Sequence, residues 1–77
     1  MAKKFTVRVC TGADGFFLPQ ASRKEGIKCV DALINRMQTN AYYVALHEDS
    51  ERGYRTLMMF ERTSLTDPWT QTVGGPE

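Results

Sequence analysis

Three side chains are of the types that bind zinc or serve as a nucleophile and its base: Cys10, Cys29 and His47. A structural zinc site takes four ligands, usually as closely spaced Cys or His pairs. These residues fall in three separate segments, with no CxxC or HxxxH pair among them. A catalytic cysteine–histidine pair must lie within hydrogen-bond reach, and this spacing does not show that. We expect no metal site, and a solvated His47 beside Glu48 and Asp49.

Two loops have compositions seen in ligand-binding loops, but neither has the full pattern. Residues 11–15 are glycine-rich, yet no helix starts directly after them and no Lys-Ser/Thr pair follows, as a phosphate loop requires. Residues 48–51 are acidic, yet they supply too few ligands at the wrong spacing for calcium. Paired carboxylates would need a cleft, which a thin domain hardly offers. The sequence predicts a protein that is not an enzyme and carries no cofactor.

Length and charge narrow the classes of protein further. The chain has 77 residues, a formal net charge of +1 and 42% hydrophobic residues. This allows one small core, and it argues against both an acidic DNA mimic and a basic non-specific nucleic-acid binder. No apolar run approaches the roughly 20 residues of a membrane span, and the N-terminus alternates instead of forming a signal peptide. We expect a cytoplasmic protein with reduced thiols and no membrane contact.

The N-terminal third predicts one strand and a second, weaker one. Residues 4–10 alternate, with Phe5, Val7 and Val9 on one face, which is typical of a half-buried strand. Residues 11–15 form a turn that contains Asp-Gly. Residues 16–20 return as a short strand or an extended loop. Because Pro19 has no N–H, this segment is expected at an edge of the sheet.

The firmest prediction is a helix that begins after Ser22. Ser22 and Glu25 have the spacing of a capping box, in which each satisfies a free amide of the first turn. Cys29 adjoins the apolar side as a small filler, and Thr39-Asn40 is the expected end. The apolar side repeats at three- and four-residue spacings and consists of Ile27, Val30, Leu33, Ile34 and Met37.

The C-terminal half predicts a β-hairpin followed by a tail. Residues 41–47 and 54–62 alternate around a polar turn at 48–53, and the composition changes to Thr, Ser, Asp, Pro and Gly from residue 63. The fold class is therefore α+β, a small two-layer sandwich with one helix on a sheet of about three or four mainly antiparallel strands in the order β-(β)-α-β-β. We expect residues 1–64 to form the single domain. We expect residues 65–77 to form a flexible or partly docked tail, pinned by Leu65 or Trp69.

One helix leaves the other face of such a sheet open, and we expect a partner to bind there. Continuous alternation places six candidate partner-binding residues on this open face: Arg8, Tyr43, His47, Arg55, Leu57 and Met59. Tyr, Met and Arg are enriched in protein interfaces. Two alternatives remain, that the tail covers this face or that the strand register differs by one residue. The expected function is a non-enzymatic protein-binding module, a small regulator, inhibitor or adaptor of a size common in phages and mobile elements, which uses this face or an edge strand.

A nucleic-acid-binding domain is the second hypothesis. Lys4, Arg8, Arg55 and His47 would surround Tyr43 as a basic platform on which a base stacks. The near-neutral net charge and the single aromatic residue on that face weaken this hypothesis. A third expectation is a homodimer formed through an edge strand, because a core of this size gives only marginal stability.

Overall fold

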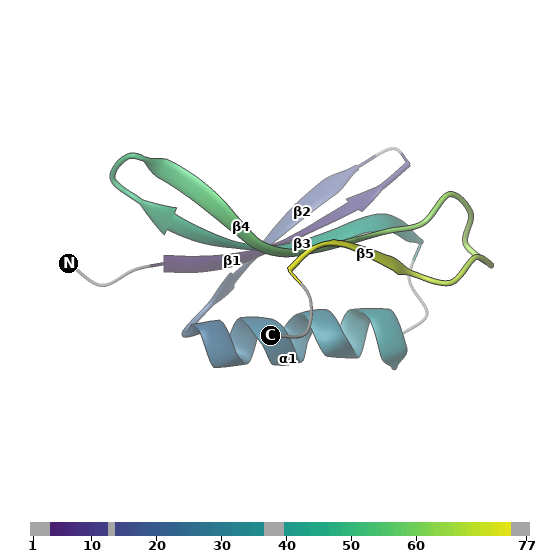
Figure 1. The fold of residues 1–77 in the computed structure, drawn as a ribbon, viewed down its shortest axis with the longest axis horizontal. Coiled ribbons are helices and arrows are strands. Elements are labelled where there is room, and N and C mark those ends of the chain that lie inside the picture. Colours follow the sequence, from purple (N-terminus) through teal and green to yellow (C-terminus); the bar gives the residue numbers. More distant parts are fainter. Residues whose placement is uncertain (1–3, 13, 37–39, 75–77) are drawn as a thin grey trace.

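The computed structural model describes residues 4–12, 14–36 and 40–74. A five-stranded antiparallel sheet carries one helix on one of its faces (Figure 1). Along the chain the elements are β1 (Lys4–Thr11), β2 (Gly15–Gln20), α1 (Arg23–Asn35), β3 (Ala41–Ser50), β4 (Gly53–Glu61) and β5 (Thr70–Val73). The strand order across the sheet is β2-β1-β3-β4-β5. The prediction of a two-layer α+β domain is confirmed.

The strand count differs from the prediction at both ends of the sheet. Residues 15–20 do form a strand, which pairs with β1 and occupies one edge. At the other edge, Thr70–Val73 pairs with β4, so a segment that the sequence places in the tail supplies a fifth strand. This strand is short and mostly exposed, so it lacks the apolar alternation by which strands are recognised.

The helix starts where its capping residue predicts. Ser22 is the N-cap, and its side chain accepts a hydrogen bond of 3.2 Å from the Glu25 N–H. The last turn closes with the Arg36 N–H on the Ala32 carbonyl. The predicted end of the helix is Thr39-Asn40; Thr39 and the last stripe residue, Met37, lie outside the described residues, and Asn40 is not helical.

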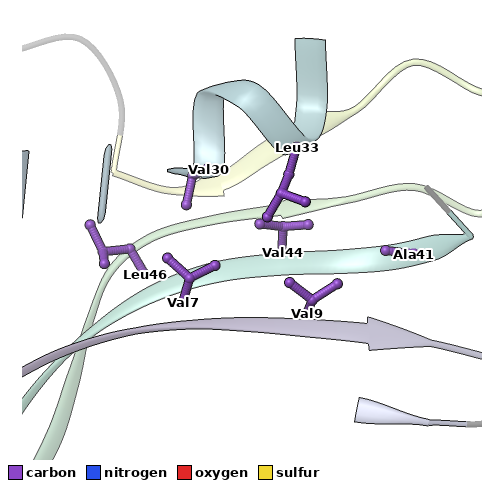
Figure 2. Packing of buried hydrophobic residues seen from close by; sticks show 7 residues of the cluster. All are labelled: Val7, Val9, Val30, Leu33, Ala41, Val44 and Leu46. Carbon is purple, nitrogen blue, oxygen red and sulfur yellow. The ribbon is translucent and has the colours of Figure 1, made fainter. Parts of the chain in front are cut away.

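The core lies between α1 and the strands β1 and β3 (Figure 2). From the helix, Val30 and Leu33 point toward the sheet, and the strands contribute Val7, Val9, Ala41, Val44 and Leu46. The predicted apolar stripe is wrong at Ile27, which is 40% exposed. Leu18 on β2 is 38% exposed.

Gly26 sets how closely the helix approaches the sheet. It is buried, and a Cβ atom built on it would lie 2.5 Å from Leu46 Cδ1. Glycine in a helix costs about 1 kcal/mol relative to alanine. Here the missing side chain lets fully buried Leu46 pack directly against the helix backbone.

Candidate binding surface

The open face is the side of the sheet that points away from α1. Val7, Val9, Val44 and Leu46 pack toward the helix, so their neighbours along each strand point the other way. Cross-strand register then gives the residues of this face. They are Lys4, Thr6, Arg8 and Cys10 from β1, Phe17 and Pro19 from β2, Tyr43, Ala45, His47 and Asp49 from β3, Tyr54, Thr56, Met59 and Glu61 from β4, and Thr70 and Val73 from β5.

A row of three side chains occupies the β2 side of the open face. The Arg8 guanidinium lies 5.8 Å from the centre of the Phe17 ring and 5.6 Å from that of the Tyr43 ring. Both distances fall within the range of a cation–π interaction. Burial raises the pKa of Tyr43, and the nearby Arg8 partly offsets this effect. The Phe17–Arg8–Tyr43 row therefore holds a cation between two rings, and no ion pair joins Arg8 to a carboxylate within the described part of the chain.

His47 lies under its neighbours instead of facing solvent. It is 5% exposed, its Nδ1 lies 3.1 Å from Thr56 Oγ1, and the Tyr54 ring meets it edge-on at 4.7 Å between ring centres. Burial lowers its pKa and Arg8 lowers it further, whereas Asp49 opposes the change. The expectation of a solvated histidine is wrong. Burial therefore favours the neutral imidazole and reduces the positive charge that His47 supplies to the face.

A β-bulge changes which β4 residues reach the open face. The β3–β4 register shifts between Leu46 and His47, so Leu46 pairs with Met58 while His47 pairs with Thr56. The extra residue is Leu57, and it packs against the core cluster. A bulge of one residue reverses the alternation beyond it. Of the expected site residues, Leu57 is therefore absent from the open face.

Arg55 is displaced from the open face for the same reason. It pairs with Glu48, and its guanidinium lies 3.4 Å from the Glu48 carboxylate on the helix side of the sheet. Tyr54, which is 65% exposed, and Thr56 take their places. Sequence reasoning missed Tyr54. The feature that places Tyr54 on the open face is the two-residue turn at 51–52, because Ser50 pairs with Gly53 and Tyr54 therefore lies opposite Asp49.

Of the six expected residues, the structure brings four to one face, Arg8, Tyr43, His47 and Met59. Met59 is half-buried and lies between Ala45 and Val73. A partner-binding role for these residues, and for Arg55 and Leu57, stays a prediction.

A hollow of about 890 Å³ lies between the end of α1 and the segment before β5. Ile34, Phe60, Arg62 and Trp69 line it. Arg62 stacks over Trp69 at 4.2 Å, and its guanidinium donates to the carbonyls of Ala41 and Leu65. These contacts attach the segment before β5 to the domain, so we assign Arg62 and Trp69 a structural role.

Groups suited to metal binding do not assemble within the residues that the structure describes. No three His, Cys, Asp or Glu side chains among them could hold a metal ion together. Cys10 lies on the open face and Cys29 on the helix. Burial raises the pKa of Cys29, with a smaller opposing effect from its hydrogen bond to Gln20. A raised pKa disfavours the thiolate that a nucleophile requires.

Searches for similar proteins returned no family model, no curated protein and no solved structure that matches this chain. The helix of the described residues is too short and too polar to cross a membrane.

Proposed function

We propose that this protein is a non-enzymatic protein-binding module, a small regulator, inhibitor or adaptor whose open face contacts the partner. The observation that carries the proposal is the Phe17–Arg8–Tyr43 row. Arginine and aromatic residues are the types most often found at the energetic centres of protein interfaces. In this row, the two rings restrict the guanidinium before any partner arrives, which lowers the entropy that binding must overcome.

The row also indicates the chemistry of the partner. Arg8 forms no ion pair with a carboxylate of the described residues, so its guanidinium favours a carboxylate on the partner, and the two rings favour an apolar or aromatic side chain beside it. Tyr54 and Met59 extend the surface toward β4. A partner segment with an acidic residue beside an apolar one fits this face.

The test is affinity capture with the full-length tagged protein, before and after nuclease treatment, followed by measurement of Kd for the captured protein. Arg8→Gln and Tyr43→Ser should each weaken binding by roughly 30-fold or more, which corresponds to the 2 kcal/mol that marks a hot-spot residue. The matched control is Arg23→Gln, at an exposed position of the helix. Binding by either row variant as tight as that of the control would contradict the proposal.

Nucleic-acid binding is the second candidate, because the same rings offer stacking surfaces for bases beside a cation. Loss of the captured material after nuclease treatment would favour this function. Arg8→Ala should then weaken binding to an oligonucleotide and reduce the salt dependence of Kd.

A further inference from the structure

The outer edge of β2 is apolar on both faces of the sheet. β2 is an end strand, and three consecutive side chains on it are exposed, Phe16 at 51%, Phe17 at 64% and Leu18 at 38%. Phe17 points to the open face, while Phe16 and Leu18 pair with Val9 and Val7 on the helix face. Gly15–Gln20 contains no charged residue. Folded proteins usually protect such an edge with charges, so an apolar edge marks a site where another strand adds.

The hydrogen-bond pattern identifies which backbone groups of β2 are directed outward. The Thr11 N–H donates to the Asp14 carbonyl at 2.7 Å, which makes this the hydrogen-bonded pair that closes the hairpin. Antiparallel pairs alternate between bonded and non-bonded. Phe16 and Leu18 therefore bond to β1, whereas Gly15, Phe17 and Pro19 direct their backbone groups away from it.

We propose that a second copy of this chain pairs its β2 with this β2, antiparallel and around a two-fold axis at Phe17. In this register Phe17 lies opposite Phe17 of the partner subunit, and each donates and accepts a backbone hydrogen bond. Gly15 lies opposite Pro19 of the partner subunit, and the glycine N–H donates to the proline carbonyl. The missing proline N–H therefore removes only one bond of that pair.

The register follows from the order of side chains on the strand. Centred on Phe17, it sets Phe16 opposite the partner subunit's Leu18, so every apolar residue of β2 meets an apolar residue. A two-residue change in register toward the turn sets Leu18 opposite Asp14. The opposite change sets Phe16 opposite Gln20. The edge is thus complementary to itself in one register, which is the requirement for a closed two-fold dimer.

The size of the surface sets the strength of the dimer. A phenylalanine buries roughly 150–250 Å² when it is fully covered, so the exposed parts of Phe16 and Phe17 amount to about 100 Å² each. The rings of two copies then contribute about 400 Å², which with Leu18 and the strand backbone stays below the roughly 1,200 Å² of a standard interface. The dimer therefore forms at high protein concentration and dissociates on dilution. The axis is perpendicular to the sheet, so both open faces point the same way.

The first experiment is sedimentation of the full chain over concentrations from low micromolar to about 1 mM. We expect the average mass to rise from monomer toward dimer for the wild type. Phe17→Lys should remain monomeric, because two like charges would meet at the axis. The matched control is Tyr54→Lys, which removes an equally exposed aromatic residue of the open face at a position away from β2 and should dimerise normally.

Amide hydrogen exchange separates edge pairing from stacking of open faces. The Phe17 N–H should be unprotected in dilute protein and become protected as the dimer forms, whereas the Phe16 and Leu18 amides are protected at every concentration. A monomer throughout the range, or a dimer whose Phe17 amide exchanges freely, would overturn the inference. Neither result bears on the partner proposed for the open face, which is tested by Arg8→Gln.

Discussion

Replacement of Gly26 with alanine tests whether close helix–sheet contact, and not helix propensity, fixes this residue. Gly26 lies in the part of α1 that crosses β3, where a Cβ would approach Leu46 Cδ1 to 2.5 Å and Cδ2 to 3.2 Å. Leu46 is fully buried, so it cannot turn its methyl groups into solvent. The added methyl group must therefore displace either the helix or the core.

The magnitude is the difference between two effects. Alanine stabilises a helix by about 1 kcal/mol relative to glycine. Insertion of a methyl group into a packed core costs about 1–3 kcal/mol. We therefore expect Gly26→Ala to lower the free energy of unfolding by up to about 2 kcal/mol, although the same change at an exposed helical position would raise it.

A double-mutant cycle with Leu46→Val isolates the contact. Valine lacks both Cδ atoms, and the remaining Cγ of Leu46 lies 3.4 Å from the built Cβ, an ordinary contact distance. Leu46→Val alone should cost about 1 kcal/mol for one lost methylene. In that background Gly26→Ala should be neutral or stabilising, which gives a coupling energy of about 1–2 kcal/mol in urea unfolding. A stabilising Gly26→Ala in the wild type, or equal effects in both backgrounds, would refute the reasoning.

Three further predictions concern single positions. The lowered pKa of His47 means that the unfolded chain takes up a proton at higher pH than the folded one, so the free energy of unfolding should fall as pH drops below about 6.5. His47→Gln should reduce this pH dependence between about pH 7.5 and 5.5. Equal slopes of unfolding free energy against pH for the variant and the wild type would contradict the burial argument. Gly53 has φ of +126° in the β3–β4 turn with no atom near a built Cβ, so Gly53→Ala should cost about 1–3 kcal/mol by backbone strain alone, and an unchanged denaturation midpoint would contradict this. Arg62→Lys should lower stability by about 1 kcal/mol and shift the fluorescence of Trp69, the single tryptophan, toward that of a solvated indole; unchanged emission would show that the stacking does not hold the segment.

The elements that sequence analysis predicted are those whose signals are local. Ser22 and the apolar spacing behind it set where α1 begins, and the alternation of Phe5, Val7 and Val9 identifies β1. Each signal depends only on residues that are close in sequence and belong to the same element. The two central strands and the helix that covers them were therefore predictable.

The β4 bulge could not be predicted because it joins two parts of one strand whose side chains alternate in opposite phase. Near the turn, Tyr54 and Thr56 face away from the helix, whereas Met58 and Phe60 pair with Leu46 and Val44 on the helix side. All four positions have the same parity, so continuous alternation would place them together. Only the extra residue at position 57 allows both arrangements.

β5 was missed because its pairing depends on contacts made far away in the sequence. Thr70–Val73 has one apolar residue, and its position against β4 follows the attachment of Trp69 under Arg62, which itself bonds to Ala41. Such a chain of tertiary contacts leaves no periodic pattern in the strand. The apolar stripe failed at Ile27 for a related reason, since helix periodicity does not show how much of the stripe the sheet covers.

The bulge also changes the charge of the open face, which bears on the choice between the two candidate functions. Without it, Lys4, Arg8 and Arg55 would share the open face with His47, and that face would be basic. With it, Arg55 binds Glu48 on the other side, and burial favours the neutral form of His47. The remaining cations, Lys4 and Arg8, are balanced by Asp49 and Glu61 on the same face. Counterion release from phosphates requires an excess of positive charge. A charge-balanced face on which Tyr54 replaces Arg55 therefore favours a protein partner over a nucleic acid.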